Sequence, residues 1–426
     1  MENLPQYLKQ HAFNLASVTD GNDFSDLQPL KKILENTRIV GLGESTHGTR
    51  EFFQLKHRIT RFLVEEMGYR VFTIEAGVMP CQNINDYVMM GKGDRAAALA
   101  SQGYWVWDTE EVTDMIEWMR AHNLSCKRGD ECQFVGYDIK PIPDACATIR
   151  RLIKPVCEKA YKQADEILTE IENIPFPYKG EKVFNNDKLL WLLGWISARQ
   201  IPITEAVGAE GYELLVTATK MMYQYFDGMV VSPRGISGRD MHMAENVTYI
   251  LNSLPPDAKI VVWAHNAHIA VNEKDKSLGW WLRQRYGDLY FPFALSFTKG
   301  QFQSRIMNMV DGEPVVGPLI EFEAPEIKED FWNKPLAEID GDYYLDLKSA
   351  IKNDEQTRKW AVENNYKIFS AGGWYSTAKA AADSEEMNSF NKYVLGKQFD
   401  GLFNIEKTTR AIPTPTGRRD ENAPMR

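Results

Sequence analysis

Short apolar runs alternate with longer helical patterns in the first part of the chain. Residues 37–42 form an apolar run that predicts a strand, and residues 49–67 carry hydrophobic side chains three and four positions apart, which predicts a helix. Gly68 ends this helix, and residues 70–74 predict the next strand. Such a strand–helix–strand unit implies parallel strands joined by a right-handed crossover.

The rest of the chain continues this pattern and interrupts it once. Residues 111–121 predict a helix, and residues 133–137 predict a third strand. From Asp144 to about Met229 the strand pattern disappears and long helical stretches follow. Further strands are predicted at 259–264, 290–297 and 402–405. We therefore predict the α/β fold class, a mostly parallel or mixed sheet flanked by helices, with an inserted all-helical subdomain.

The pattern divides the chain into three parts. Residues 1–143 and 230–412 form one discontinuous α/β domain, and residues 144–229 form the all-helical insertion. The tail at 413–426 is rich in proline, glycine and charged residues, so we expect it to be disordered.

Charge and cysteine content narrow the possible partners and the cellular location. Asp plus Glu outnumber Lys plus Arg by 59 to 49, which argues against a nucleic-acid partner because binding phosphate needs clustered positive charge. No run of apolar residues is long enough to span a membrane, and the first residues do not form a signal-peptide pattern. The five cysteines contain no C-x-x-C pair, which argues against a structural zinc site. A reducing cytoplasm is the expected location.

Acids and imidazoles gather where the predicted strands end. Three of the seven histidines lie at such positions. The residues are Glu44 and His47 after the first strand, Glu75 and Asp138 at the ends of the next two, and His265 and His268 after the strand at 259–264. Because ligands bind beyond the carboxyl ends of parallel strands, we expect these side chains to form one site.

Two kinds of chemistry fit this set of residues. A neutral imidazole can take a proton from water while a carboxylate orients the ring and stabilises the imidazolium that forms. Histidine and carboxylate are also zinc ligands, so metal-assisted hydrolysis stays open. Each residue taken alone has a structural explanation, but their convergence on one sheet edge favours a functional site.

Two basic residues of the predicted helix at 49–67 lie near this edge. Lys56 falls on or beside the buried stripe, where an ammonium is costly unless it is paired. Helical side chains lean toward the N-terminus, so Lys56 can reach a carboxylate of the site, or it can extend to solvent from the edge of the stripe. Arg50, in the first turn, can polarise a carbonyl oxygen or be an exposed helix residue.

Other residues are weaker candidates for binding substrate. Trp105 and Trp107, in a predicted loop, can form an apolar wall. Arg239 can face the site, and Asp240 beside it suits the first turn of the following helix by its charge. Ser45 misses the G-x-S-x-G nucleophile pattern because His47 stands where the closing glycine belongs, which argues against a serine nucleophile.

Several sequence blocks together resemble the erythromycin esterase family. They occur in family order from about Asp26 to Lys407. The blocks are Gly43-Glu44-Ser45-Thr46-His47-Gly48, Arg50-Glu51-Phe52-Phe53, Lys56-His57-Arg58, Glu75, Met243-Ala244-Glu245-Asn246, Ala264-His265-Asn266-Ala267-His268-Ile269 and Phe399-Asp400-Gly401-Leu402-Phe403. The combination is specific, whereas any single block is weak.

The resemblance implies a fold, an activity and a set of site residues. The fold is an α/β domain with an all-helical subdomain that forms part of the substrate cleft. The activity is hydrolysis of the macrolactone ester of 14-membered macrolides such as erythromycin, which inactivates the antibiotic and confers resistance. The family's general base matches His47, and its other essential positions match Glu44, Glu75, His265 and His268. Lys56 stands where some relatives have arginine, a departure that loses a bidentate fork.

We therefore expect a carboxylic ester hydrolase that uses no cofactor and forms no acyl-enzyme. His47, oriented by Glu44 or Glu75, deprotonates a water that attacks the lactone carbonyl. His265 or His268 supports the oxyanion or protonates the departing alkoxide. Three alternatives stay open: a metal-assisted hydrolase that binds a divalent metal, a hydrolase of the same fold with another ester or lactone substrate, and a non-catalytic macrolide-binding protein.

Overall fold

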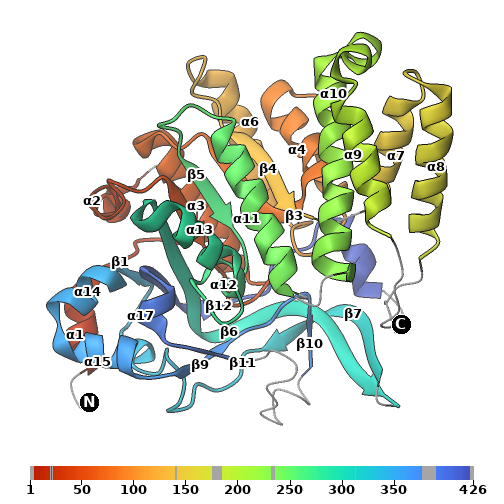
Figure 1. Cartoon of the computed structure of the whole chain (residues 1–426). Helices are drawn as coiled ribbons and strands as arrows, with labels where there is room; N and C mark the ends of the chain where they lie inside the picture. The colour runs from red at the N-terminus through yellow and green to blue at the C-terminus, as the bar shows by residue number, and fades with distance from the viewer. Residues whose placement is uncertain are drawn as a thin grey trace.

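The computed structural model describes residues 4–19, 21, 23–139, 142–174, 185–231, 236–311, 313–376 and 390–422. A sheet flanked by helices forms one side of the molecule, a group of long helices stands beside it, and a long hairpin extends beneath both (Figure 1). The predicted α/β fold class, with its mixed sheet and flanking helices, is confirmed.

The described part of the chain forms a ten-stranded mixed sheet. The strands β12, β6, β2, β5, β3 and β4 lie side by side in this order and run parallel. At one edge β8 is antiparallel to β12, and β1 is antiparallel to β8. The strands are β1 (Ala12–Asn14), β2 (Ile39–Leu42), β3 (Val71–Gly77), β4 (Gln133–Asp138), β5 (Ile260–Trp263), β6 (Tyr290–Val310), β7 (Glu313–Glu323), β8 (Tyr343–Leu345), β10 (Trp374–Tyr375) and β12 (Gly401–Thr408), while β9 (Tyr366–Phe369) and β11 (Phe390–Tyr393) pair separately.

Both faces of the sheet are buried, which explains why its strands appear as apolar runs. On β5, Val261 and Trp263 point into one hydrophobic cluster, and Ile260 and Val262 point into the other. The first cluster includes α3 and α6, and the second includes α11 and α13. The helices of this region are α1 (Leu4–His11), α2 (Leu30–Ile33), α3 (Arg50–Met67), α4 (Val78–Met90), α5 (Arg95–Ala100), α6 (Glu110–Ser125), α11 (Ile236–Asn252), α12 (Asn266–Ile269), α13 (Leu278–Tyr286), α14 (Leu347–Asn353), α15 (Glu355–Glu363) and α17 (Leu395–Gln398).

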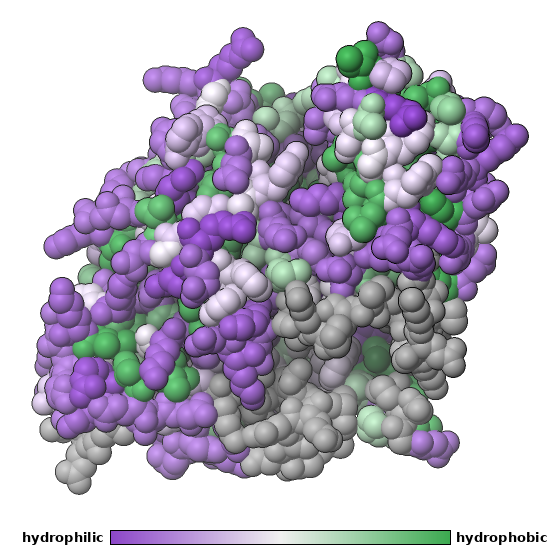
Figure 2. All heavy atoms as spheres, in the orientation of Figure 1, coloured by the Kyte–Doolittle hydropathy of each residue, from purple (hydrophilic) through white to green (hydrophobic). Residues whose placement is uncertain are grey.

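The region between β4 and α11 is helical in the residues that the structure describes. It contains α7 (Ile142–Ile153), α8 (Glu158–Glu172), α9 (Asp187–Ser197) and α10 (Gln200–Tyr225). These helices pack around a third hydrophobic cluster of their own. Figure 2 shows hydrophobic residues among hydrophilic ones on the surface over α9 and α10, where Trp191 is 37% exposed. The division into domains stays a prediction.

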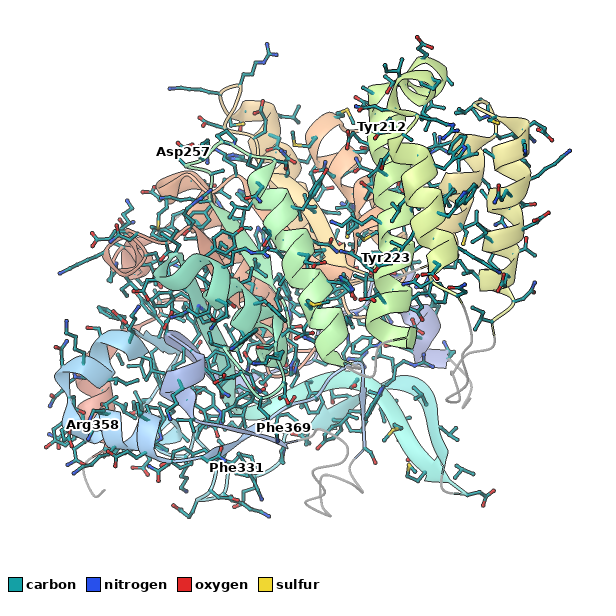
Figure 3. The ribbon with its side chains drawn as sticks, viewed as in Figure 1. Tyr212, Tyr223, Asp257, Phe331, Arg358 and Phe369 are labelled. Atoms are coloured by element: carbon teal, nitrogen blue, oxygen red, sulfur yellow. The ribbon has the colours of Figure 1, made fainter. Side chains whose placement is uncertain are left out.

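The carboxyl ends of the parallel strands face the hairpin. In Figure 3, Asp257, which precedes β5, lies in the upper part of the view, so β5 begins there. β6 runs parallel to β2 and continues into the hairpin, so the carboxyl ends of the parallel strands lie on the hairpin side (Figure 1). The helix α10 descends beside them from Tyr212 to Tyr223 (Figure 3).

The hairpin is the largest element that the hydrophobic pattern did not predict. The strand expected at 290–297 continues to Val310 as β6 and returns as β7, with irregular pairing between Arg305 and Met307. The short strand β10 pairs parallel with β6 along its other edge. The half-exposed residues of this extension lack the strict alternation that marks a strand buried on one face.

The predicted disordered tail is wrong for residues 413–422. Pro413 bridges Thr109, and the buried Thr414 donates a hydrogen bond to Asp108. Residues Gly417–Asn422 form a 3-10 helix. The polar composition suggested disorder, but these polar groups bond to the loop before α6. Residues 423–426 lie outside the described part of the chain.

In the part of the chain that the structure describes, none of the helices combines the length and the apolar character needed to cross a bilayer.

Candidate active site

Glu44 is the centre of the first of two networks of charged groups at the strand ends. It follows β2, and its side chain is completely buried. Its Oε2 atom accepts hydrogen bonds from Lys56 Nζ at 2.7 Å and from Trp263 Nε1 at 2.9 Å. Burial alone would raise the pKa of Glu44, but Lys56 and His47 outweigh that effect and hold the pKa below its usual value. The Glu44 carboxylate is therefore ionised at neutral pH.

Lys56 reaches this carboxylate from α3, as its place on the buried stripe predicts. Its side chain is 0% exposed, so the alternative in which it extends to solvent is wrong. The ammonium also lies 4.3 Å from the centre of the Trp263 ring, a cation–π contact. Burial lowers the pKa of Lys56 to about 8, and Glu44 opposes this shift, so the ammonium is charged at neutral pH.

His47 presents one free ring nitrogen. Its Nδ1 atom lies 2.6 Å from Glu44 Oε1, and its side chain is 12% exposed. Because an ionised carboxylate only accepts hydrogen bonds, the hydrogen must lie on Nδ1. No hydrogen bond to Nε2 is found within the described residues. With the hydrogen on Nδ1, the neutral form of the ring has its lone pair on Nε2, which is the form that acts as a general base.

Arg239 is the centre of the second network. Its Nε and Nη2 atoms donate to the two oxygens of Asp138 at 2.9 and 2.8 Å, and Nη2 also donates to Glu75 Oε1 at 2.8 Å. A guanidinium binds a carboxylate with two parallel bonds of this kind. Burial opposes ionisation of Glu75, but His268 and Arg239 hold its pKa well below the usual range.

A backbone irregularity places Glu75 in this network. The register of β3 against β4 shifts between Ile74 and Gly77, and Glu75 lies inside the shift. Such irregularities redirect side chains and are common beside active sites.

His268 lies between two carboxylates. Its Nδ1 atom is 2.7 Å from Asp240 Oδ1, and its Nε2 atom is 3.2 Å from Glu75 Oε1. Burial alone would lower the pKa of His268, but Asp240 and Glu75 raise it to about 10. His268 is then an imidazolium at neutral pH, with both N–H groups directed at carboxylates. Arg239 Nη1 lies 3.1 Å from the same Nε2, an approach of two cations that the surrounding carboxylates offset.

His265 joins the two networks without being charged. Its backbone N–H donates to Glu75 Oε2 at 3.0 Å, and its ring centre lies 5.0 Å from that of His47. The ring Nδ1 accepts from Ala267 N–H, so Nε2 carries the hydrogen and faces the carbonyl of Ser45 at 3.2 Å. Burial, followed by the neighbouring His47, lowers the pKa of His265 to about 3.

The loops after β2 and β5 approach so closely that residue 43 must be glycine. A side chain at Gly43 would place its Cβ atom 2.0 Å from Asn266 Oδ1 and 2.9 Å from the carbonyl of Phe293. The amide of Asn266 in turn bonds the backbone of Leu295 on β6. This packing fixes the distance between His47 and His265.

Asp240→Asn should destabilise the protein in a pH-dependent way. The folded chain holds the His268 proton up to about pH 10, whereas an unfolded chain releases it near pH 6.5. The stabilisation is therefore complete below the unfolded pKa and is lost as pH rises toward the folded pKa. Losing a charged hydrogen bond costs about 1.5–3 kcal/mol, which should appear as a lower melting temperature at low pH.

Calorimetry of wild type and Asp240→Asn on both sides of this pH window tests the assignment. The difference in melting temperature should be larger below the window than at its alkaline end. Glu245→Gln is a matched control, because Glu245 lies on the same helix and pairs with His242 while its side chain is 45% exposed. An equal difference at every pH would contradict the assignment of His268 as charged.

The remaining predicted residues differ in whether they contact the site. Trp107 is buried, and its ring centre lies 6.3 Å from that of His47, so it can form part of the site wall. Trp105 is also buried, but within the described residues no ring contact joins it to His47. Arg50 is 42% exposed and pairs with Glu111 at 3.2 Å, and within the described residues no hydrogen bond or ion pair joins its side chain to either network. Arg239 faces the site, as predicted.

The sequence did not indicate the role of Trp263, and it indicated a different role for Asp240. Trp263 appears only as one more apolar residue of a buried strand, and its bond to Glu44 depends on tertiary packing. Asp240 was predicted to act through its charge at the start of a helix. Its carboxylate instead bonds His268 and the backbone N–H of Leu278 at 2.9 Å. The sequence signal for this role of Asp240 is its position directly after Arg239.

Ser45 and metal binding are both poorly supported by this geometry. Ser45 Oγ is buried and has no hydrogen-bond partner within the described residues, so no described base activates it. Among those same residues, no group of three or more His, Cys, Asp and Glu side chains is arranged to hold a metal ion. The carboxylate oxygens of Glu44 and Glu75 already accept hydrogen bonds from N–H groups of the protein.

The fold and the two networks together define a class of protein. It is an α/β protein with a helical insertion, in which histidines and buried carboxylates meet at the carboxyl ends of a parallel sheet. The model of the erythromycin esterase family matches residues 64–408. The chain belongs to the erythromycin esterase family.

Individual curated proteins are similar to this chain in sequence, and solved structures are similar to it in fold. Erythromycin esterase type II from Escherichia coli is 28% identical over 275 residues, which cover 58% of this chain and 64% of that protein. A solved structure of a succinoglycan biosynthesis protein has a TM-score of 0.75 at 22% identity, covering 97% of this chain and 98% of its own. The erythromycin esterase mutant EreC, in its open conformation, has a TM-score of 0.65 at 17% identity, covering 91% and 94%. The chain matches a little under two thirds of the length of the curated relatives.

Proposed function

We propose that this protein hydrolyses the macrolactone ester of 14-membered macrolides such as erythromycin, and that this reaction confers antibiotic resistance. Membership of the erythromycin esterase family supports the substrate class. The geometry of His47 supports the chemistry, and it is the observation that carries the proposal. Glu44 accepts the hydrogen of Nδ1, and within the described residues Nε2 has no hydrogen-bond partner.

The proposed reaction needs only this histidine and water. His47 Nε2 takes a proton from water, and the oxygen attacks the lactone carbonyl carbon. The carbonyl π electrons move to its oxygen, forming a tetrahedral oxyanion. Collapse breaks the ring C–O bond, and the His47 imidazolium returns its proton to the departing alkoxide. The product is an open hydroxy acid, and water is the only other reactant.

The return of the proton by His47 revises one expectation from the sequence. His265 and His268 were both candidates to protonate the alkoxide. Both nitrogens of each ring already have partners within the described residues. We therefore give them supporting roles, with His265 packed against His47 and His268 holding Glu75 ionised. Glu44, rather than Glu75, is the carboxylate that orients His47.

Mass spectrometry of macrolides incubated with the protein tests the proposal. Hydrolysis adds one water to the substrate mass, so a 14-membered macrolide should be converted to the mass of its hydroxy acid. A panel that also contains 15- and 16-membered macrolides and a succinylated polysaccharide compares the substrates suggested by the relatives. An unchanged macrolide that nevertheless binds the protein would support a non-catalytic binding role instead.

The same assay after chelation tests the metal-assisted alternative. Undiminished turnover in the presence of a chelator is expected, since the carboxylates of the site are paired with Lys56 and Arg239. We also propose a cytoplasmic location, which is supported by the five free cysteines. The expected partner is the small-molecule substrate, with no role for nucleic acid or a membrane.

A further inference from the structure

Trp374 is an exposed aromatic residue on a strand that is otherwise well packed. It lies on β10, opposite Arg305 of β6, and its neighbour Tyr375 lies opposite Ile306. Tyr375 is 4% exposed and packs against the rings of Phe302 and Phe322, whereas Trp374 is 40% exposed. Because side chains alternate along a strand, Trp374 points to the opposite face from this aromatic cluster.

Backbone hydrogen bonds join the segment that carries Trp374 to the loop of His47. The carbonyl of Ala371 accepts the backbone N–H of His47 at 3.1 Å, and the N–H of Ala371 donates to Ser45 at 2.8 Å. Ser304 on β6 then donates to the carbonyl of Gly372 at 3.1 Å. Three residues of extended chain span about 10 Å, so Trp374 lies within that distance of Ala371 along the backbone.

The loop of His47 and the strand of Trp374 lie along the same edge of β6, the edge opposite β7. The backbone N–H of Gln303 donates to the carbonyl of Gly48 at 3.0 Å, and β10 pairs with Arg305 two residues further on. The side chain of Gln303 packs against Gly48, the residue after His47. A Cβ atom at Gly48 would lie 2.6 Å from Gln303 Cγ and 2.0 Å from its carbonyl oxygen. This edge of β6 therefore runs from the loop of His47 to Trp374.

A second exposed hydrophobic residue lies further along β6. Met309 follows the irregular pairing between Arg305 and Met307 and is 44% exposed. In Figure 1, β10 lies below the lower ends of α10 and α11, and the hairpin extends outward from it. Pairing with β6 holds the strand of Trp374 in place, so binding there costs little conformational entropy. Sites for large ligands are lined mainly by such hydrophobic and aromatic side chains.

We propose that Trp374 binds the apolar face of a large lactone substrate beside His47, and so selects large apolar esters over small ones. This inference rests on the proposed function. The indole ring offers a flat apolar surface that does not enter the chemical step. A small ester reaches His47 without touching Trp374, whereas a macrolactone opened at His47 extends across the hairpin face. The contribution of Trp374 should therefore appear in substrate binding rather than in the rate of bond cleavage.

Kinetics with one large and one small ester test this role. Trp374→Ala should raise KM for a 14-membered macrolide about tenfold, the change that about 1.4 kcal/mol of lost binding produces, and leave kcat nearly unchanged. Turnover of p-nitrophenyl acetate should not change. Trp374→Phe should restore part of the affinity. Leu289→Ala is the control, because Leu289 is a comparably exposed hydrophobic residue directly before β6, at the end of the strand opposite the hairpin, and should affect neither substrate.

The outcomes separate this inference from the proposed function. If wild type opens the macrolide and Trp374→Ala has the same KM, or loses activity equally on both esters, the inference is wrong and the function stands. If wild type does not open the macrolide, the proposed function is wrong. Calorimetric titration of the macrolide into wild type and Trp374→Ala then tests the contact directly, and equal affinities or no binding would overturn it.

Discussion

His47→Ala is expected to lower the rate of lactone opening by about 10²–10⁴-fold, the typical contribution of a positioned general base. The variant removes the only ring nitrogen of the described site that is oriented by a carboxylate and still free to accept a proton. Glu44 keeps its hydrogen bonds to Lys56 and Trp263 in this variant, so the fold should remain intact. Initial rates, with product measured by mass spectrometry, give the size of the loss.

Ser45→Ala is the matched control for this loss. Ser45 lies in the same loop but has no hydrogen-bond partner within the described residues, so its removal should change the rate less than twofold. A large loss in Ser45→Ala, with normal folding, would indicate a serine nucleophile and an acyl-enzyme. Near-normal turnover by His47→Ala would show that another group activates the water.

Arg239→Leu is expected to have the largest effect on stability. The substitution leaves the buried carboxylates of Asp138 and Glu75 without their shared cation. Removing one partner of a buried ion pair typically costs about 3–5 kcal/mol, because the remaining charge is not solvated. The loss should also be greater than that of an exposed pair, whose contribution is about 0–1 kcal/mol.

Urea denaturation measures this effect. Arg239→Lys restores the charge but not the planar fork, so its stability should lie between those of wild type and Arg239→Leu. Arg358→Leu is the control for an exposed arginine that also pairs with two glutamates, and it should change the free energy of unfolding little. A loss below about 1 kcal/mol in Arg239→Leu would mean that Asp138 and Glu75 are not held as ions by Arg239.

The strand ends could be predicted from the sequence because they depend on local patterns. A strand buried on both faces appears as an apolar run, and the first ionisable residues after it must lie at one edge of a parallel sheet. This reasoning brings Glu44, His47, Glu75, His265 and His268 together. In the structure His47 contacts Glu44, His268 contacts Glu75, and His265 lies between these two networks. For Lys56, the cost of burying an ammonium made a carboxylate partner one of two open alternatives, and the structure shows that the partner is Glu44.

The separate roles of the site residues could not be predicted from the sequence. Whether Glu44 or Glu75 orients His47 depends on distances between elements that are far apart in the chain. The same is true of Trp263, whose indole N–H is invisible in an apolar pattern, and of Asp240, whose carboxylate turns toward α12 and not toward its own helix. The hairpin and the ordered tail were missed because their packing depends on contacts with distant loops.

Chemical rescue of His47→Gly by added imidazoles tests most directly whether the imidazole of residue 47 is the base. The glycine variant should be nearly inactive toward the macrolide, and added imidazole should restore lactone opening in proportion to its concentration. Among substituted imidazoles of similar size, the restored rate should rise with the pKa of the added base. Turnover by His47→Gly that is close to wild type without imidazole, or a restored rate that is independent of the pKa of the added base, would contradict the account.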